Sequence, residues 1–231
     1  MISNDLMVKG KAGLFSAIES AANQRSARAY VVLTAMLFAL SVLLHFTVPE
    51  LGATPYFMAF SGVLLAFSLA ELAVVLKRKG IGNRLKWVIG IGFIVSAITT
   101  TSTLGAVGSV IYVFPMLLSI QYCSVLYSLF ISAVTVMGAF APLLLSSSLF
   151  NFDLNVVRLI PGSAVEVAST LEAALGPGVI NEAGTKASEV LTTYLPLILF
   201  INIIAVVTVS VTSAIRKSLL EQYHHFQTTR E

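Results

Sequence analysis

Two titratable side chains stand out because each lies within or beside a long apolar stretch of this 231-residue sequence. Glu71 directly follows a run of 20 uncharged residues, and an acid near the centre of a membrane helix costs at least ~2.5 kcal/mol. Its carboxyl group could bind a proton or a cation, or it could instead extend toward Lys77, Arg78 or Arg84. His45 could sense external pH, because histidine titrates nearest neutral pH, or it could be an interfacial residue without a task.

A cluster of hydroxyl groups forms the other candidate site. Thr99, Thr101 and Thr103 precede a glycine-containing break, and Tyr112 follows that break. These side chains could line a small wet pocket, although threonines in helices commonly bond the carbonyls of their own helix. Together with the two titratable residues above, they are the candidates for binding or sensing a small ligand, whose identity is unknown.

Catalytic motifs are absent from the sequence. It contains no Gly-rich phosphate loop, no His-Glu-x-x-His, no Cys-x-x-Cys and no Gly-x-Ser-x-Gly. The pair His224-His225 lacks the sequence context of a phospho-accepting histidine and is interpreted as solvent-exposed. The single cysteine, Cys123, excludes an internal disulfide. We therefore expect no enzymatic activity from this chain, no cofactor and no metal.

The composition is that of an integral membrane protein. Hydrophobic residues make up 57% of the chain, charged residues 11%, and the mean hydropathy is +0.90, far more apolar than a soluble domain. Each uncharged run reaches the ~20 apolar residues that a crossing of the hydrocarbon core requires. The uncharged runs lie at 29–49, 51–70, 87–152 and 190–215.

These runs predict an all-α bundle of six transmembrane helices. The longest run is long enough for three crossings, and it breaks near Gly105 and again near Tyr122. The third and fourth helices are short for full spans, so a re-entrant pair is the alternative, and it would leave every other segment on the same side. The predicted helices are 29–48, 55–76, 87–103, 107–122, 125–149 and 191–215.

The distribution of lysine and arginine predicts the orientation, because basic residues near span ends stay on the cytoplasmic side. Twelve of the 14 basic residues fall before the first helix, between the second and third, or after the last. Both termini are therefore expected in the cytoplasm, and the loop at 150–190 outside.

The net charge of +3 indicates contact with anionic lipid headgroups, not with nucleic acid. The chain divides into an amphipathic interfacial segment at 1–28, the bundle at 29–215 and a cytoplasmic helix at 216–231.

The last helix has features of a dimer interface. Asn202 lies in the middle of the span, where an amide favours a partner across a helix interface. Beyond the membrane, Ile215, Leu219 and Phe226 continue a heptad-like stripe into the cytoplasmic tail. We expect these four residues to pair two chains in parallel and to relay a signal along the tail; an ordinary helical extension that frays is the alternative.

The stretch from Tyr112 to Phe140, with Pro115 and Tyr122 seven residues apart, and the tail from Leu219 to Glu231 resemble the membrane sensory region of bacterial diguanylate cyclases (GGDEF proteins) and related sensor kinases. The resemblance implies a sensory input module in the bacterial inner (plasma) membrane, acting as a homodimer on a cytoplasmic output domain. The GGDEF domain itself is missing, so no cyclase activity follows.

A second interpretation is a small transport subunit, such as the substrate-binding component of a vitamin importer, which also has six spans in a chain of about this length. Ala35 and Ala39 would provide a small-xxx-small face for docking such a subunit on its partner, although this pattern is frequent in membrane helices.

Overall fold

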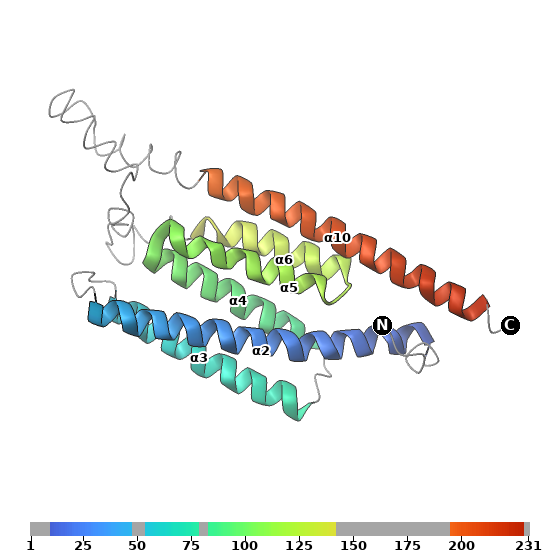
Figure 1. The fold of residues 1–231 in the computed structure, drawn as a ribbon, viewed down its shortest axis with the longest axis horizontal. Helices are drawn as coiled ribbons and strands as arrows, with labels where there is room; N and C mark the ends of the chain where they lie inside the picture. The colour runs from blue at the N-terminus through green and yellow to red at the C-terminus, as the bar shows by residue number, and fades with distance from the viewer. Residues whose placement is uncertain (1–9, 48–53, 79–82, 142–194, 229–231) are drawn as a thin grey trace, which may run out of the picture.

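The computed structural model describes residues 10–47, 54–78, 83–141 and 195–228 (Figure 1). These residues are almost entirely helical, and no strand occurs among them. The elements are α2 (Gly10–Thr47), α3 (Thr54–Lys77), α4 (Asn83–Leu104), the 3₁₀ helix η1 (Gly105–Tyr112), α5 (Val113–Ile120), α6 (Val125–Gly138) and α10 (Leu195–Thr228).

Each helix predicted from the uncharged runs overlaps a helical segment, with η1 and α5 together covering the fourth. Residues 142–149 of the fifth prediction and 191–194 of the sixth lie outside the described residues. Four segments are long and apolar enough to cross a membrane: Gly13–Thr47, Pro55–Lys77, Arg84–Leu104 and Ile198–Thr228. The third predicted helix is longer than expected, because α4 has 22 residues and is one of these four. The shorter apolar helices are Gly108–Ile120 and Val125–Gly138. The chain is thus a helical bundle with the character of a multi-pass membrane protein.

The segment predicted to lie on the membrane surface is continuous with the first span, since α2 runs as one helix from Gly10 to Thr47. The predicted outer loop at 150–190 lies outside the described residues.

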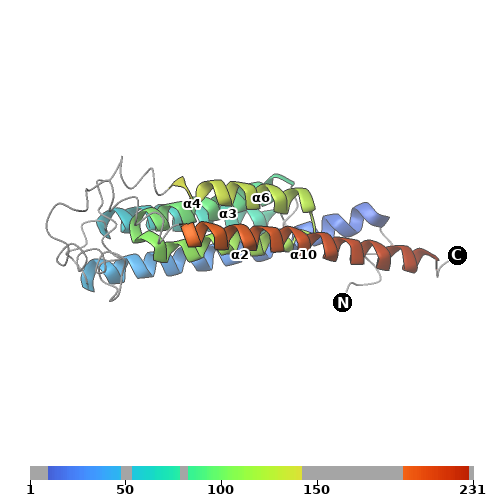
Figure 2. The same ribbon diagram turned by 90° about the horizontal axis from the view of Figure 1, so that it is seen from above.

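Helix α4 is the centre of the bundle and contacts α2, α3, η1, α5 and α6. Helices α2 and α3 form an antiparallel hairpin on one side of it, and α5, α6 and α10 lie on the other (Figure 1). Seen from above, the helices lie along one long axis, and α10 extends beyond α3 and α6 at one end (Figure 2). Side chains on α4 can therefore meet groups from both halves of the bundle.

The described basic residues gather at one end of the bundle. The first half of α2, the end of α3, the start of α4 and the last turns of α10 all lie toward the same end of the bundle (Figure 1). No lysine or arginine occurs in the parts of the described helices that lie toward the opposite end. The basic side chains at the basic end are Arg25, Arg28, Lys77, Arg78, Arg84, Lys86, Arg216 and Lys217.

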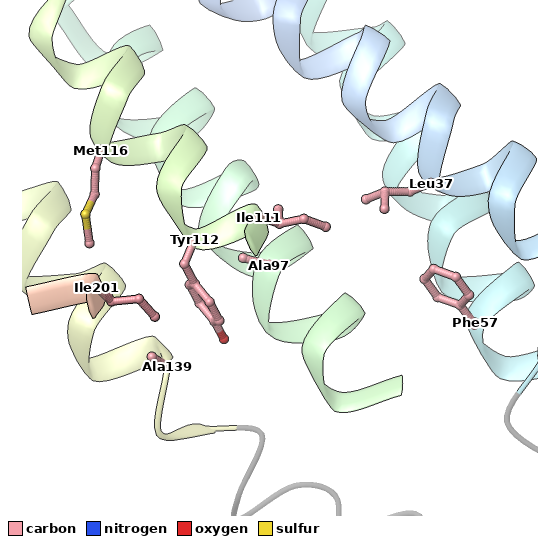
Figure 3. Close-up of a cluster of buried hydrophobic side chains, with 8 residues drawn as sticks. All are labelled: Leu37, Phe57, Ala97, Ile111, Tyr112, Met116, Ala139 and Ile201. Atoms are coloured by element: carbon pink, nitrogen blue, oxygen red, sulfur yellow. The ribbon is translucent and has the colours of Figure 1, made fainter. Parts of the chain in front are cut away.

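Apolar side chains occupy both the interior and the outer surface. Figure 3 shows one interior cluster, in which Leu37, Phe57, Ile111 and Met116 are buried among residues from six elements. Large apolar residues are also exposed on the outer faces, for example Phe46 at 77%. In water such a surface would be unfavourable, whereas in a bilayer it faces lipid.

Candidate functional site

Helices α2 and α3 meet along a ladder of hydroxyl pairs. The oxygens of Ser41 and Ser61 lie 2.9 Å apart, and those of Thr34 and Ser68 lie 2.7 Å apart. The two rungs are seven residues apart on each helix, so they lie on one face of both. Small residues at this spacing let two helices approach closely, and their hydroxyls can hydrogen-bond across the interface.

Glu71 lies on the same face of α3, one turn beyond Ser68. Its side chain is 6% exposed, and neither carboxyl oxygen has a hydrogen-bond partner among the described residues. Lys77, Arg78 and Arg84 are exposed, and none of them forms an ion pair with it in the described part of the chain. The structure therefore places this carboxyl group inside the bundle and does not show the expected alternative of pairing with the following basic residues.

Three tyrosines lie within electrostatic range of this carboxyl group: Tyr30 of α2, Tyr122 of the turn between α5 and α6, and Tyr127 of α6. The Tyr30 hydroxyl lies 3.2 Å from the Ser96 hydroxyl on α4. The rings of Tyr122 and Tyr127 are 4.7 Å apart. We call Glu71 and these three tyrosines the acid–tyrosine cluster; it joins the α2–α3 hairpin to the other half of the bundle.

Two glycines of α4 allow the tyrosine rings to pack directly on its backbone. A Cβ atom added at Gly92 would lie 2.9 Å from the Tyr30 ring, and one added at Gly90 would lie 2.7 Å from the Tyr127 hydroxyl. Contacts this close are not tolerated without movement of a neighbour. A side chain at Gly92 would therefore displace Tyr30, and one at Gly90 would displace Ile131, whose Cδ1 would lie 2.5 Å away, or Tyr127.

An ion pair lies beside the cluster at the basic end. The Lys86 ammonium is 3.2 Å from a Glu19 carboxyl oxygen, with both side chains mostly buried. The Tyr127 hydroxyl donates to the Lys86 carbonyl at 2.7 Å. The same ammonium lies 6.0 Å from the Trp87 ring centre and 5.9 Å from that of Tyr127. The nearby lysine thus already has an acidic partner other than Glu71.

The predicted hydroxyl cluster near the end of α4 bonds largely to its own helix. Thr99 donates to the Val95 carbonyl at 2.9 Å, and Thr103 donates to the Thr99 carbonyl at 3.0 Å. Thr101 is buried, and no described residue bonds its hydroxyl. Tyr112 is buried too and donates to the Gly138 carbonyl at 2.9 Å. These contacts stabilise helix packing and do not outline a pocket.

His45 lies near the end of α2 that is remote from the basic residues. Its ring is half-buried and packs edge-on against Phe46, with 5.4 Å between ring centres. The structure does not bring it to Glu71, so the two titratable candidates belong to different ends of the bundle.

The predicted relay residues follow α10 from the bundle to its tail. Asn202 is exposed on the outer surface, and its amide donates to the Ile198 carbonyl of its own helix at 2.8 Å. Ile215 is 37% exposed, and Leu219 and Phe226 are half-buried. Asn202 is therefore at the lipid-facing surface, not in the interior of the single chain.

Sequence reasoning missed a hydrogen-bonded contact between α10 and the rest of the bundle. The hydroxyls of Ser128 on α6 and Thr212 on α10 lie 3.1 Å apart, and Ser119 of α5 donates to Ser128 at 3.1 Å. Like the α2–α3 ladder, this contact uses small hydroxyl residues in apolar runs. The spacing of these hydroxyl residues along their helices, and not their hydrophobicity, could have predicted the contact.

Two further contacts place the start of the tail. The Arg216 guanidinium lies 5.7 Å from the centre of the Phe15 ring near the start of α2. Cys123, in the turn between α5 and α6, is near enough to respond to the same cation: burial raises the pKa of its thiol, and Arg216 opposes that shift. Arg216 thus lies where α10, the first turns of α2 and the α5–α6 turn approach one another.

No group of three metal-ligating side chains occurs among the residues the structure describes. Neither a protein-family model, nor a curated protein, nor a solved structure matches the chain.

Proposed function

We propose that this chain is the membrane-embedded sensory input module of a bacterial signalling receptor, which passes a ligand or membrane signal through its C-terminal helix to a cytoplasmic output domain. The observation that carries the proposal is the continuity of α10, which runs for 34 residues without a break. At 1.5 Å per residue its length is about 50 Å. A hydrocarbon core of roughly 30 Å leaves a substantial part of the helix beyond the membrane.

The contacts of α10 support a relay because one lies within the bundle and the other lies at the start of the cytoplasmic tail. Within the bundle, Thr212 bonds Ser128 of α6. One turn further along, Arg216 contacts Phe15. A helix held at two such points moves as a unit when the bundle repacks, so a change around α5 and α6 is transmitted to Leu219 and Phe226 in the tail.

The orientation belongs to the same proposal. The bundle crosses the inner membrane six times, with the basic end in the cytoplasm and the loop at 150–190 outside. The concentration of described lysines and arginines at one end supports this, because positive residues are retained on the cytoplasmic side.

The proposed active form is a parallel homodimer with α10 near the two-fold axis. Asn202 supports it, since an amide at a lipid-facing position gains by meeting its counterpart across a helix interface. The exposed parts of Ile215, Leu219 and Phe226 would extend the interface into the cytoplasm.

A transport subunit is the second candidate. Ala35 and Ala39 are both exposed on the outer face of α2, where small residues permit another membrane helix to approach closely. In that case α2, not α10, would form the principal contact, and the partner would be a different protein.

Crosslinking distinguishes the two. In chains carrying Cys123→Ser, a single cysteine is placed at Leu219 or at Ala35 and oxidised in native membranes. The sensory proposal predicts a disulfide-linked homodimer through Leu219→Cys and none through Ala35→Cys. A monomeric chain that reacts only at Ala35→Cys, with a different protein, would reject the sensory function in favour of the transport subunit.

A further inference from the structure

The acid–tyrosine cluster contains a carboxyl group whose surroundings match its neutral form. Both oxygens of Glu71 are buried without a hydrogen-bond partner among the described residues. Lys86, whose backbone carbonyl accepts from Tyr127 of the cluster, is paired with Glu19. A carboxylate at this position would carry an uncompensated charge in an apolar interior, which proteins avoid by protonation or by pairing.

The polar groups around Glu71 come from several elements of the bundle. Tyr30 of α2, Tyr122 of the α5–α6 turn and Tyr127 of α6 lie within electrostatic range of it. Glu19 of α2 acts in the same way on Tyr122 and Tyr127. Helix α4 contributes Ser96, through its contact with Tyr30. Phenol hydroxyls can donate to a carboxylate, but the Tyr30 and Tyr127 hydroxyls are already engaged, with Ser96 and with the Lys86 carbonyl.

The packing limits what could bind there. The Tyr30 ring and the Tyr127 hydroxyl lie against the α4 backbone at Gly92 and Gly90, so no space for a ligand remains between these groups and α4. A divalent metal is disfavoured as well, because the described residues provide no cluster of three ligating side chains.

We infer that Glu71 is a reversible proton-binding site that controls how α3 packs against the other helices. In the protonated state the neutral carboxyl group fits the structure described here. Release of the proton to bulk water leaves a carboxylate that must recruit the tyrosine hydroxyls or water. That recruitment breaks the Tyr30–Ser96 contact between α2 and α4 or loosens α3. Only its effect on the tail rests on the proposed sensory function; proton binding does not.

The chain's single tryptophan reports on this site, because the Trp87 ring is 5.1 Å from that of Tyr127. The experiment uses the full chain in lipid nanodiscs and follows Trp87 fluorescence between about pH 4 and pH 9, the range in which exposed and buried glutamates titrate. Infrared difference spectra across the same range detect the carbonyl band of a protonated carboxyl group.

The wild type should show one fluorescence transition together with loss of a carboxyl band as pH rises. Glu71→Gln, which resembles the protonated form, should abolish the fluorescence transition and remove the part of the carboxyl band that is lost with it, leaving only the bands of the other acids. A triple variant with His45, His224 and His225 changed to Gln should retain both. Tyr30→Phe keeps the ring and removes a donor to the carboxylate, so it should move the transition to higher pH, which loss of packing alone would not do.

A transition that persists unchanged in Glu71→Gln, or that disappears in the histidine variant, would overturn the inference. If Glu71→Gln does not fold, Glu71→Asp replaces it: a shifted transition supports the site, and an unshifted one rejects it.

Crosslinking through Leu219→Cys at both pH extremes separates proton binding at Glu71 from the proposed relay to the tail. Unchanged crosslinking beside an intact Glu71 transition would count against the relay and leave the proton site standing.

Discussion

The hydroxyl oxygens of Thr34 on α2 and Ser68 on α3 lie 2.7 Å apart inside the bundle. Each hydroxyl also approaches a carbonyl of its own helix, Tyr30 at 3.0 Å and Leu65 at 2.8 Å. Because each hydroxyl has a single proton, only one of the two keeps its full bond to its own helix, and the other donates across the interface. This arrangement suits a membrane interior, where polar side chains must find partners within the protein.

The Thr34–Ser68 contact should give a small but measurable coupling energy. In a double-mutant cycle with Thr34→Val and Ser68→Ala, we expect a coupling of about 0.6 kcal/mol and at most about 1.7 kcal/mol, the range for hydrogen bonds between membrane helices. Reversible unfolding in mixed micelles measures it. As the control, Thr99→Val paired with Ser68→Ala should be additive, because Thr99 bonds Val95 of its own helix. Equal coupling in both cycles would show that the hydroxyl contact is not the cause.

Gly92 should be intolerant of even one methyl group. In Gly92→Ala the new Cβ would meet the buried Tyr30 ring at 2.9 Å, and overpacking of this kind costs roughly 1–3 kcal/mol. Thermal unfolding in detergent should show a lower midpoint for this variant.

Gly62→Ala is the matched control, since its Cβ would lie 3.4 Å from the Phe38 ring, an ordinary contact. It should leave stability unchanged or raise it by up to about 1 kcal/mol through helix propensity. Equal losses in the two variants would mean that the Tyr30 contact does not limit the site.

The positions of the helices were predictable because charge is excluded from membrane spans and turns interrupt the runs. The break near Gly105 marks the start of η1, and the break at Tyr122 marks the turn before α6. The buried faces were not predictable from hydrophobicity, since lipid and protein interior are equally apolar. Ile89 is buried at 1% and Leu43 is 58% exposed, yet both are aliphatic residues in uncharged runs.

Glu71 shows the same limit for the candidate site. The sequence placed it in a span, but whether it turned inward or toward the basic residues depended on the rotation of α3 against α2. That rotation is fixed by Ser61 and Ser68 meeting Ser41 and Thr34. Both helices have Ser or Thr residues seven positions apart. This spacing predicts the rotation of α3 once the two helices are known to be antiparallel.

Cys123 should react slowly with maleimides in the folded chain. The thiol is buried, and burial raises its pKa, so less thiolate is present at neutral pH than for a free cysteine. Arg216 acts in the opposite direction, so Arg216→Ala should slow the reaction further, while Lys217→Ala should have little effect. Mass spectrometry of timed labelling reactions measures these rates. Faster labelling in Arg216→Ala would indicate that the arginine shields the thiol instead of favouring the thiolate.

The basic end of the bundle should face the cytoplasm. In a Cys123→Ser chain, a cysteine at Glu172 should react with a membrane-impermeant maleimide added outside intact cells, whereas one at Gly80 should react only after permeabilisation. The reason is the position of Gly80 between the basic residues that end α3 and begin α4. Labelling of both positions from outside would overturn the proposed orientation.

Asn202 should strengthen the proposed parallel dimer without being essential to it. An asparagine amide has two N–H donors and an oxygen, and the bond to Ile198 uses one donor, so the group can still bond its counterpart in a second chain. Such a contact contributes about 0.6 to 2 kcal/mol, which corresponds to a roughly threefold to thirtyfold change in the dimer dissociation constant.

In native membranes, cysteines at Leu219 and Phe226 should crosslink two chains efficiently, and one at the exposed Glu221 should do so poorly. Asn202→Leu should reduce crosslinking at Leu219→Cys when the chain is diluted with lipid. Val206→Leu, one turn away and also exposed on the outer surface, serves as the control and should not. If all three cysteine positions crosslink equally, the tail has no defined interface. If Asn202→Leu has no effect while Leu219→Cys still crosslinks, the dimer is held by the cytoplasmic tail and not by the membrane-embedded amide.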